Sequence, residues 1–138
     1  MPTRSDWMAA VGVMALLVGC ESRTVRMSGS ADVPAAEGTV RVSAGANGNT
    51  LLDIEVLHLA LPERATAGAT TFVVWALPLG ETTPQNVGAL RVDHDLRGTL
   101  KTLTPLRGLE VFITAEPEPM RASPSGPRLL TARIPPES

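Results

Sequence analysis

The densest group of chemically capable side chains in this sequence is Asp93-His94-Asp95. Two carboxylates in one loop can bind calcium, and the histidine between them could add a ligand for a transition metal. A calcium loop of the EF-hand type also needs further oxygen ligands and a terminal glutamate, and none follow at that spacing. Asp and Gly are equally common in hairpin turns, and Gly98 ends this stretch. We interpret the segment as a turn, with Asp93, His94 and Asp95 as weak metal candidates.

Other residues with catalytic potential lie in patterns that favour structural roles. His58 and His94 are far apart in the sequence, so their spacing defines no zinc site, and we expect a structural role for His58. Glu110, Glu116 and Glu118 could act as an acid and base pair, but they alternate along one face of an expected strand. No Gly-x-Ser-x-Gly sequence marks a serine nucleophile. We therefore predict no enzyme activity and no cofactor.

Cys20 is the only cysteine and follows an apolar run that extends from Met8 to Val18. A basic residue (Arg4), an apolar run of about 7–15 residues and a small residue (Gly19) before the exit are typical of a secretory signal. The run is shorter than the roughly 20 apolar residues that a membrane-spanning helix needs. A single cysteine also excludes a disulfide within the chain.

The sequence Leu17-Val18-Gly19-Cys20 resembles the lipobox of bacterial lipoproteins. The resemblance implies that the Cys20 thiol carries a diacylglyceryl group and that the chain is cleaved before Cys20. Because each buried CH₂ contributes about 0.8 kcal/mol and one acyl chain binds only marginally, two or three chains are needed for a stable anchor. Residue 21 is a glutamate and not an aspartate. By the same resemblance, the absence of aspartate at this position favours the outer membrane. We expect an exported protein, anchored by lipid and facing the periplasm.

Composition limits the partners of the remaining chain. Residues 20–138 suffice for one domain with a single core. The formal net charge is −2 and no basic stripe is present, so we expect no nucleic acid partner. With no tyrosine, two tryptophans and two phenylalanines, the chain is poor in side chains for stacking on bases or sugars. Twelve glycines and twelve prolines favour turns over helices.

Alternation of apolar and polar residues predicts about seven short strands. They cover residues 39–44, 52–56, 70–79, 88–92, 99–103, 109–116 and 128–134. Such spacing favours an all-β fold, an antiparallel β-sandwich that is Ig-like. The alternation changes parity after Val56, which either a bulge near Leu57-His58 or a strand end buried on both faces would explain. The residues expected in the core are Ile54, Val56, Phe72, Val74, Trp75, Val111 and Ile113.

These elements predict four segments along the chain. Residues 1–19 form the lipoprotein signal peptide, and residues 20–37 form the lipidated cysteine and a flexible tether without a sustained apolar period, with an early strand around Thr24–Met27 as an alternative for part of it. Residues 38–135 form the β-sandwich, and residues 136–138 form a frayed tail.

Residues 72–134 resemble the C-terminal extracytoplasmic domain of anti-sigma-K-type factors. The matching residues are Val74-Trp75, Gly88-Ala89-Leu90, Asp93 to Gly98, Thr114-Ala115-Glu116-Pro117 and Pro124-Ser125-Gly126-Pro127. Those regulators also have a cytoplasmic sigma-binding part and a transmembrane helix, which this sequence lacks. The resemblance therefore implies a β fold and an envelope location, and it does not imply anti-sigma activity.

Together these features predict a non-enzymatic, lipid-anchored envelope protein with a structural or protein-interaction role. Its expected contacts are the membrane, through the lipid on Cys20, and another envelope protein. The alternative is an envelope sensor module that binds a small ligand or a metal.

Overall fold

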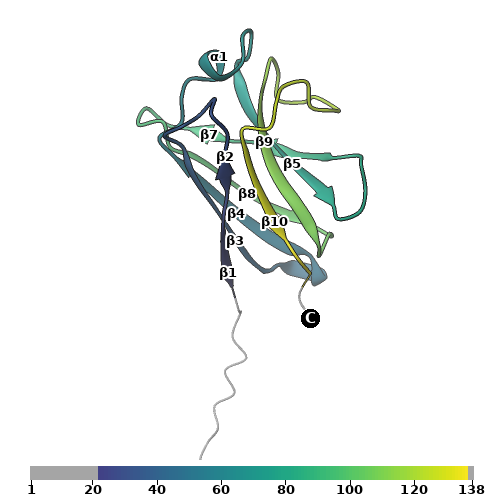
Figure 1. Cartoon of the computed structure of the whole chain (residues 1–138). Coiled ribbons are helices and arrows are strands. Elements are labelled where there is room, and N and C mark those ends of the chain that lie inside the picture. The colour runs from purple at the N-terminus through teal and green to yellow at the C-terminus, as the bar shows by residue number, and fades with distance from the viewer. Residues whose placement is uncertain (1–21, 137–138) are drawn as a thin grey trace, which may run out of the picture.

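The computed structural model describes residues 22–136, which form ten strands, one short α-helix and one 3-10 turn (Figure 1). In chain order the strands are β1 (Arg23–Arg26), β2 (Ser28–Gly29), β3 (Glu37–Ala44), β4 (Thr50–Leu57), β5 (Thr71–Pro78), β6 (Gln85–Ala89), β7 (Arg91–Val92), β8 (Gly98–Thr104), β9 (Leu109–Glu116) and β10 (Leu130–Ile134). The 3-10 turn covers Ala46–Gly48, and helix α1 covers Pro62–Ala65.

Two five-stranded sheets pack face to face. The first sheet has the order β1-β3-β4-β8-β7, the second has the order β2-β10-β9-β5-β6, and every pair of neighbouring strands is antiparallel. The predicted antiparallel β-sandwich is therefore confirmed. Within the first sheet, β3 and β4 form a hairpin.

The chain crosses between the sheets at both edges of the sandwich. β1 belongs to the first sheet and β2 to the second, and buried Met27 lies between them. Likewise Leu90, 6 % exposed, separates β6 in the second sheet from β7 in the first. The single strand predicted for residues 88–92 is thus two strands joined by a kink. These crossings leave only short strands at the sheet edges, which limits unwanted pairing with other chains.

Residues 23–36 fall within the predicted tether, and β1 overlaps the early strand considered around Thr24–Met27. β1 pairs along its whole length with β3, and β2 pairs with β10. Met27 and Val33 are 8 % and 2 % exposed and extend the core at this edge. The apolar residues here are too few and too widely spaced to give a period, because the segment changes sheets after four residues of strand. The predicted signal peptide and Cys20 lie outside the described residues, as do residues 137–138.

The main core lies between the two sheets. Six of the expected core residues, all except Trp75, belong to it and are fully buried: Ile54, Val56, Phe72, Val74, Val111 and Ile113. Trp75 is also fully buried, but it lies on the opposite face of β5 with Val73 and Phe112 in a second cluster. Alternation along a strand explains the difference, because neighbouring side chains point to opposite faces.

His58 accounts for the change of parity after β4. Its φ angle is 58°, in the left-handed region that non-glycine residues rarely adopt. This turn of the backbone places both Val56 and Leu59 in the core, at 0 % and 2 % exposure, although they are three positions apart and strict alternation would direct them to opposite faces. A left-handed residue at the end of the strand thus takes the place of the predicted bulge, while the His58 side chain is exposed.

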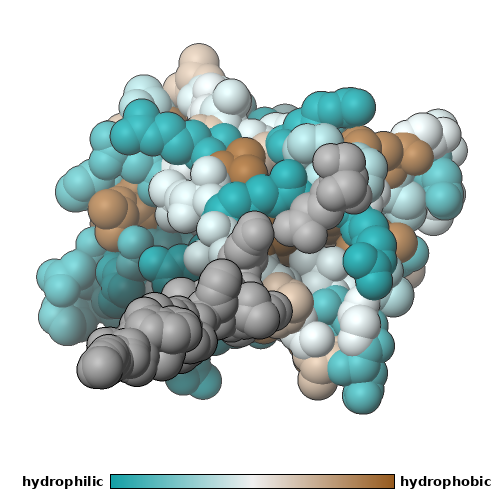
Figure 2. Space-filling view, turned by 90° about the horizontal axis from the view of Figure 1, so that it is seen from below, coloured by the Kyte–Doolittle hydropathy of each residue, from teal (hydrophilic) through white to brown (hydrophobic). Residues whose placement is uncertain are grey.

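Both ends of the described chain, Ser22 and Pro136, lie at the same end of the sandwich (Figure 1). Viewed from this end, the surface is mainly hydrophilic, with small and separate hydrophobic areas (Figure 2). Within residues 22–136, no helix combines the length and the apolar character needed to cross a membrane.

Replacing His58 with glycine should stabilise the domain. A left-handed conformation costs a non-glycine residue about 1–2 kcal/mol, while glycine adds about 0.5–1 kcal/mol of unfolded-state entropy. The free energy of unfolding, measured by urea denaturation, should therefore rise by up to about 1 kcal/mol. His94→Gly is the matched control, because His94 is an exposed turn residue without a positive φ angle. A loss of stability in His58→Gly equal to that in His94→Gly would contradict the assignment of strain.

Candidate functional site

The outer face of the first sheet carries two rows of polar side chains. In the first row, Arg41 on β3 lies opposite Asp53 on β4, which lies opposite Lys101 on β8. The second row, two residues along the strands, consists of Thr39, Glu55, Thr99 and Arg91. The register that buries Val40, Leu52 and Ile54 between the sheets necessarily directs their polar neighbours outward.

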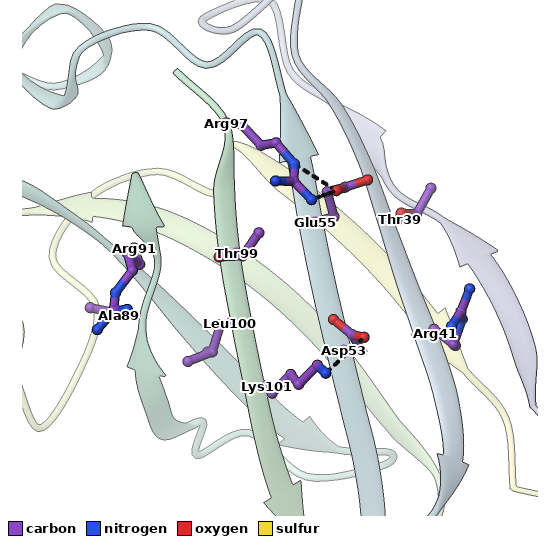
Figure 3. A pocket seen from close by; sticks show the side chains of 10 residues that line it. All are labelled: Thr39, Arg41, Asp53, Glu55, Ala89, Arg91, Arg97, Thr99, Leu100 and Lys101. Carbon is purple, nitrogen blue, oxygen red and sulfur yellow. Dashed lines mark hydrogen bonds and ion pairs between the residues drawn. The ribbon is translucent and has the colours of Figure 1, made fainter. Parts of the chain in front are cut away.

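These rows line an open hollow of about 750 Å³ (Figure 3). Its lining consists of Thr39, Arg41, Asp53, Glu55, Ala89, Arg91, Arg97, Thr99, Leu100 and Lys101. The volume lies within the range of roughly 300–1,000 Å³ found for ligand sites, but such sites are usually concave and mainly apolar. This hollow instead has a polar lining that suits groups able to form ion pairs and hydrogen bonds.

Two of the four cations in the hollow neutralise its two carboxylates. Arg97 Nε donates to Glu55 Oε2 at 2.7 Å, and Arg97 Nη2 donates to the same oxygen. The hydrogen bond and the charge of Glu55 raise the pKa of Arg97, so this guanidinium stays protonated. Lys101 Nζ lies 4.0 Å from Asp53 Oδ2, which is an ion pair without hydrogen-bond contact.

Arg41 and Arg91 are the uncompensated charges of the hollow. Neither forms an ion pair with a carboxylate in the described part of the chain. Both side chains are exposed, and they lie on opposite sides of the hollow, on β3 and β7 (Figure 3). With both acids already paired, the hollow has a surplus of two positive charges, although the net charge of the whole chain is −2.

A second polar network, centred on Glu116, lies on the outer face of the second sheet. Trp75 Nε1 donates to Thr114 Oγ1 at 2.9 Å, and the Thr114 hydroxyl donates to Glu116 Oε2 at 2.5 Å. Ser125 donates to the Glu116 carboxylate through its backbone N–H, at 3.0 Å, and through its hydroxyl. The backbone N–H of Gly126 donates at 3.3 Å. Glu116 is 0 % exposed, so these donors replace the water that it loses.

Opposing effects act on the pKa of Glu116. Burial raises it, because a carboxylate loses solvation in a low-dielectric environment. Hydrogen bonds from Ser125, Thr114 and Gly126 lower it by a larger amount, so the pKa lies below its usual value and the group stays ionised. Arg121 Nε, 3.7 Å from Glu116 Oε1, supplies a nearby positive charge.

Residues 117–128 pack over the outer face of the second sheet. Trp75 and Phe112 stack with ring centroids 6.4 Å apart, and the guanidinium of Arg128 lies 4.0 Å from the centroid of Phe112. Asn86 Nδ2 donates to the carbonyls of Pro119 and Arg121, each at 2.9 Å. The Glu116 network thus attaches a loop to the sheet and closes this face.

The glutamates considered as an acid and base pair have separate partners. Glu110 bonds to Arg128, whereas Glu116 is shielded beneath the loop. Glu118 Oε1 lies 4.0 Å from Arg121 Nη1 at the surface. The structure therefore places one of the three in a buried network and the other two in surface ion pairs.

Asp93 organises the turn between β7 and β8. Its Oδ1 accepts hydrogen bonds from the backbone N–H of Arg97, at 3.0 Å, and of Asp95, at 2.9 Å. The bond from Arg97 lowers the pKa of Asp93 most, even though burial opposes it. The side chain of His94 is 92 % exposed. Across residues 22–136, the structure brings no three or more His, Cys, Asp or Glu side chains together as a metal-binding group.

Sequence reasoning did not identify either the hollow or the Glu116 network. Arg41, Asp53 and Glu55 alternate with apolar residues, and this alternation marked a polar face that points outward. The order of the strands was needed to show that these charges lie together. For Glu116 local sequence gave no distinct signal, because Glu110 and Thr114 share its face of β9. No model of a known protein family and no curated protein matches this chain.

Glu116→Gln should destabilise the protein by about 1–3 kcal/mol, because it removes a charged acceptor from buried donors. The unfolded-state pKa of Glu116 is about 4.5 and its folded pKa is lower. Its contribution is therefore complete above pH 4.5 and is lost as the pH falls through the folded pKa. Urea denaturation between pH 6 and pH 3 should show a steeper loss of stability in the wild type than in the variant.

Glu118→Gln provides the control for this experiment, because the Glu118 side chain is 68 % exposed. We expect it to change the free energy of unfolding by less than about 0.5 kcal/mol. Equal effects of the two substitutions at neutral pH would contradict the role assigned to Glu116.

Proposed function

We propose that this protein is a non-enzymatic lipoprotein of the bacterial envelope that binds another envelope protein through the outer face of its first sheet. The observation that carries the proposal is the open hollow with Arg41 and Arg91 on opposite sides, each without an ion-pair partner in the described chain. Exposed arginines are common in protein interfaces, where the planar guanidinium binds carboxylates and carbonyls.

The contrast between the two outer faces supports this choice of surface. On the second sheet, Trp75 and Phe112 are 0 % and 2 % exposed, and the guanidinium of Arg128 lies over the Phe112 ring. On the first sheet, the polar rows line a hollow that is open to solvent. A partner could therefore reach four neighbouring strands of the first sheet without any rearrangement of the fold.

The lipobox at Leu17-Val18-Gly19-Cys20 supports the proposed anchor. β1 begins at Arg23, three residues after Cys20. Three residues of extended chain span at most about 11 Å. A lipid on Cys20 would therefore hold the end of the sandwich shown in Figure 2 next to the membrane, with the domain facing the periplasm from the outer membrane.

A small-ligand sensor is the second candidate, and the volume of the hollow favours it. About 750 Å³ would accommodate a small polar molecule. The two candidates differ in what crosslinks to the hollow in cells, because a small ligand would yield no protein adduct.

Replacing Cys20 with alanine should abolish incorporation of labelled palmitate and release the protein from the membrane fraction, because no lipid would remain. Both properties can be measured by metabolic labelling and by fractionation of cells. Ser22→Ala is the matched control and should keep both. Membrane association that persists in Cys20→Ala would refute the proposed anchor.

A photoreactive amino acid at Thr99, within the hollow, should give a discrete protein adduct when intact cells are irradiated. The same amino acid at Thr82, which is exposed in the loop between β5 and β6, should not give that adduct. Mass spectrometry of the adduct would identify the partner. The absence of an adduct at Thr99, or an identical adduct at both positions, would count against the proposed surface.

A further inference from the structure

We infer that the segment bound in the hollow is an extended acidic peptide, whose carboxylates pair with Arg41 and Arg91. The inference rests on the proposed function, because it specifies the chemistry of the partner at the same surface. Its basis is the distribution of charge in the hollow, where two cations are paired internally and two are not.

The separation of the two free arginines favours a chain over a single small anion. β3 and β7 are three strand spacings apart in the first sheet. At about 4.8 Å per spacing, their backbones are roughly 14 Å apart. One phosphate or carboxylate would contact only one of these guanidinium groups. An extended peptide advances about 3.3 Å per residue, so roughly four or five residues span the distance.

The acids at the centre of the hollow restrict where the carboxylates of the partner can lie. Asp53 and Glu55 are on β4, between the strands that carry Arg41 and Arg91. A carboxylate placed over Asp53 and Glu55 would be repelled by two like charges. Lys101 and Arg97 already pair with these two acids, so they are not free to bind the carboxylate of a partner. The partner therefore needs its acidic residues at the two ends of the bound segment and neutral polar residues between them.

The lining also argues against a nucleic acid as the anionic chain. The ten lining residues include no aromatic side chain on which a base could stack. Each guanidinium can instead form a bidentate pair with a carboxylate, which adds geometric selectivity to the attraction of charge. The hydroxyls of Thr39 and Thr99 offer further hydrogen bonds to a peptide backbone.

The inference can be tested with the full-length lipoprotein in detergent micelles and two fluorescein-labelled peptides. One peptide has glutamates separated by three or four serine and threonine residues, and the other has glutamine in place of both glutamates. Fluorescence anisotropy should show at least about tenfold tighter binding of the glutamate peptide, since a hydrogen bond to a charged group contributes about 1.5–3 kcal/mol. Added salt should weaken the binding, because exposed charges are screened.

Arg41→Gln/Arg91→Gln should reduce the affinity for the glutamate peptide at least about tenfold. Arg64→Gln/Arg133→Gln removes the same charge from exposed positions outside the hollow and should leave the affinity unchanged. Urea denaturation would establish that both double variants fold like the wild type, as expected for exposed side chains.

Equal binding of the two peptides, or unchanged binding by Arg41→Gln/Arg91→Gln, would overturn the acidic partner. If the Thr99 adduct still formed in cells, the proposed interaction surface would stand without it. The opposite result, selective peptide binding without a Thr99 adduct, would confirm the preference for acidic segments and contradict the proposed function.

Discussion

Strands β5 and β9 require cover on both faces, and this requirement shapes the rest of the molecule. β5 is apolar on both faces, β9 carries Phe112 among polar residues on its outer face, and the two strands pair along eight residues. One face, with Phe72 and Val74, packs against the first sheet. The other, with Trp75 and Phe112, needs a separate cover, which residues 117–128 provide. The second sheet is consequently closed on its outer side, and the first sheet is the layer that presents a polar surface.

The buried carboxylate of Glu116 makes that cover specific. A charge without water is costly unless hydrogen bonds replace the water, and removal of one partner leaves the others unsatisfied. Donors from Ser125 and Gly126 on the loop, and from Thr114 on the strand, satisfy Glu116 only when the loop lies in one position. By contrast, the Arg97–Glu55 pair is exposed, and such pairs contribute about 0–1 kcal/mol. The charges of the hollow are therefore available for binding at little cost to stability.

Much of the strand pattern could be predicted from local sequence, because alternation reflects burial on one face. The seven predicted strands all correspond to strands in the structure, although residues 88–92 divide at Leu90. Residues 23–36 showed no sustained period in the sequence because β1 and β2 are too short to give one. The change of parity at Leu57-His58 was visible in the sequence, but its cause was a left-handed His58 and not an inserted residue.

The sequence by itself determined the local features: the β class, the turn at Asp93 and the burial of the apolar strand residues. These follow from residue types and near neighbours, which local patterns record. Only the tertiary structure decided that Trp75 belongs to a second cluster, that Glu116 is sealed beneath residues 117–128, and that Arg41 and Arg91 share one hollow. Arg41 and Arg91 are fifty residues apart in the chain, and the strand order of the first sheet brings them to one surface. Strand order depends on the packing of the whole core, so no local pattern could specify that surface.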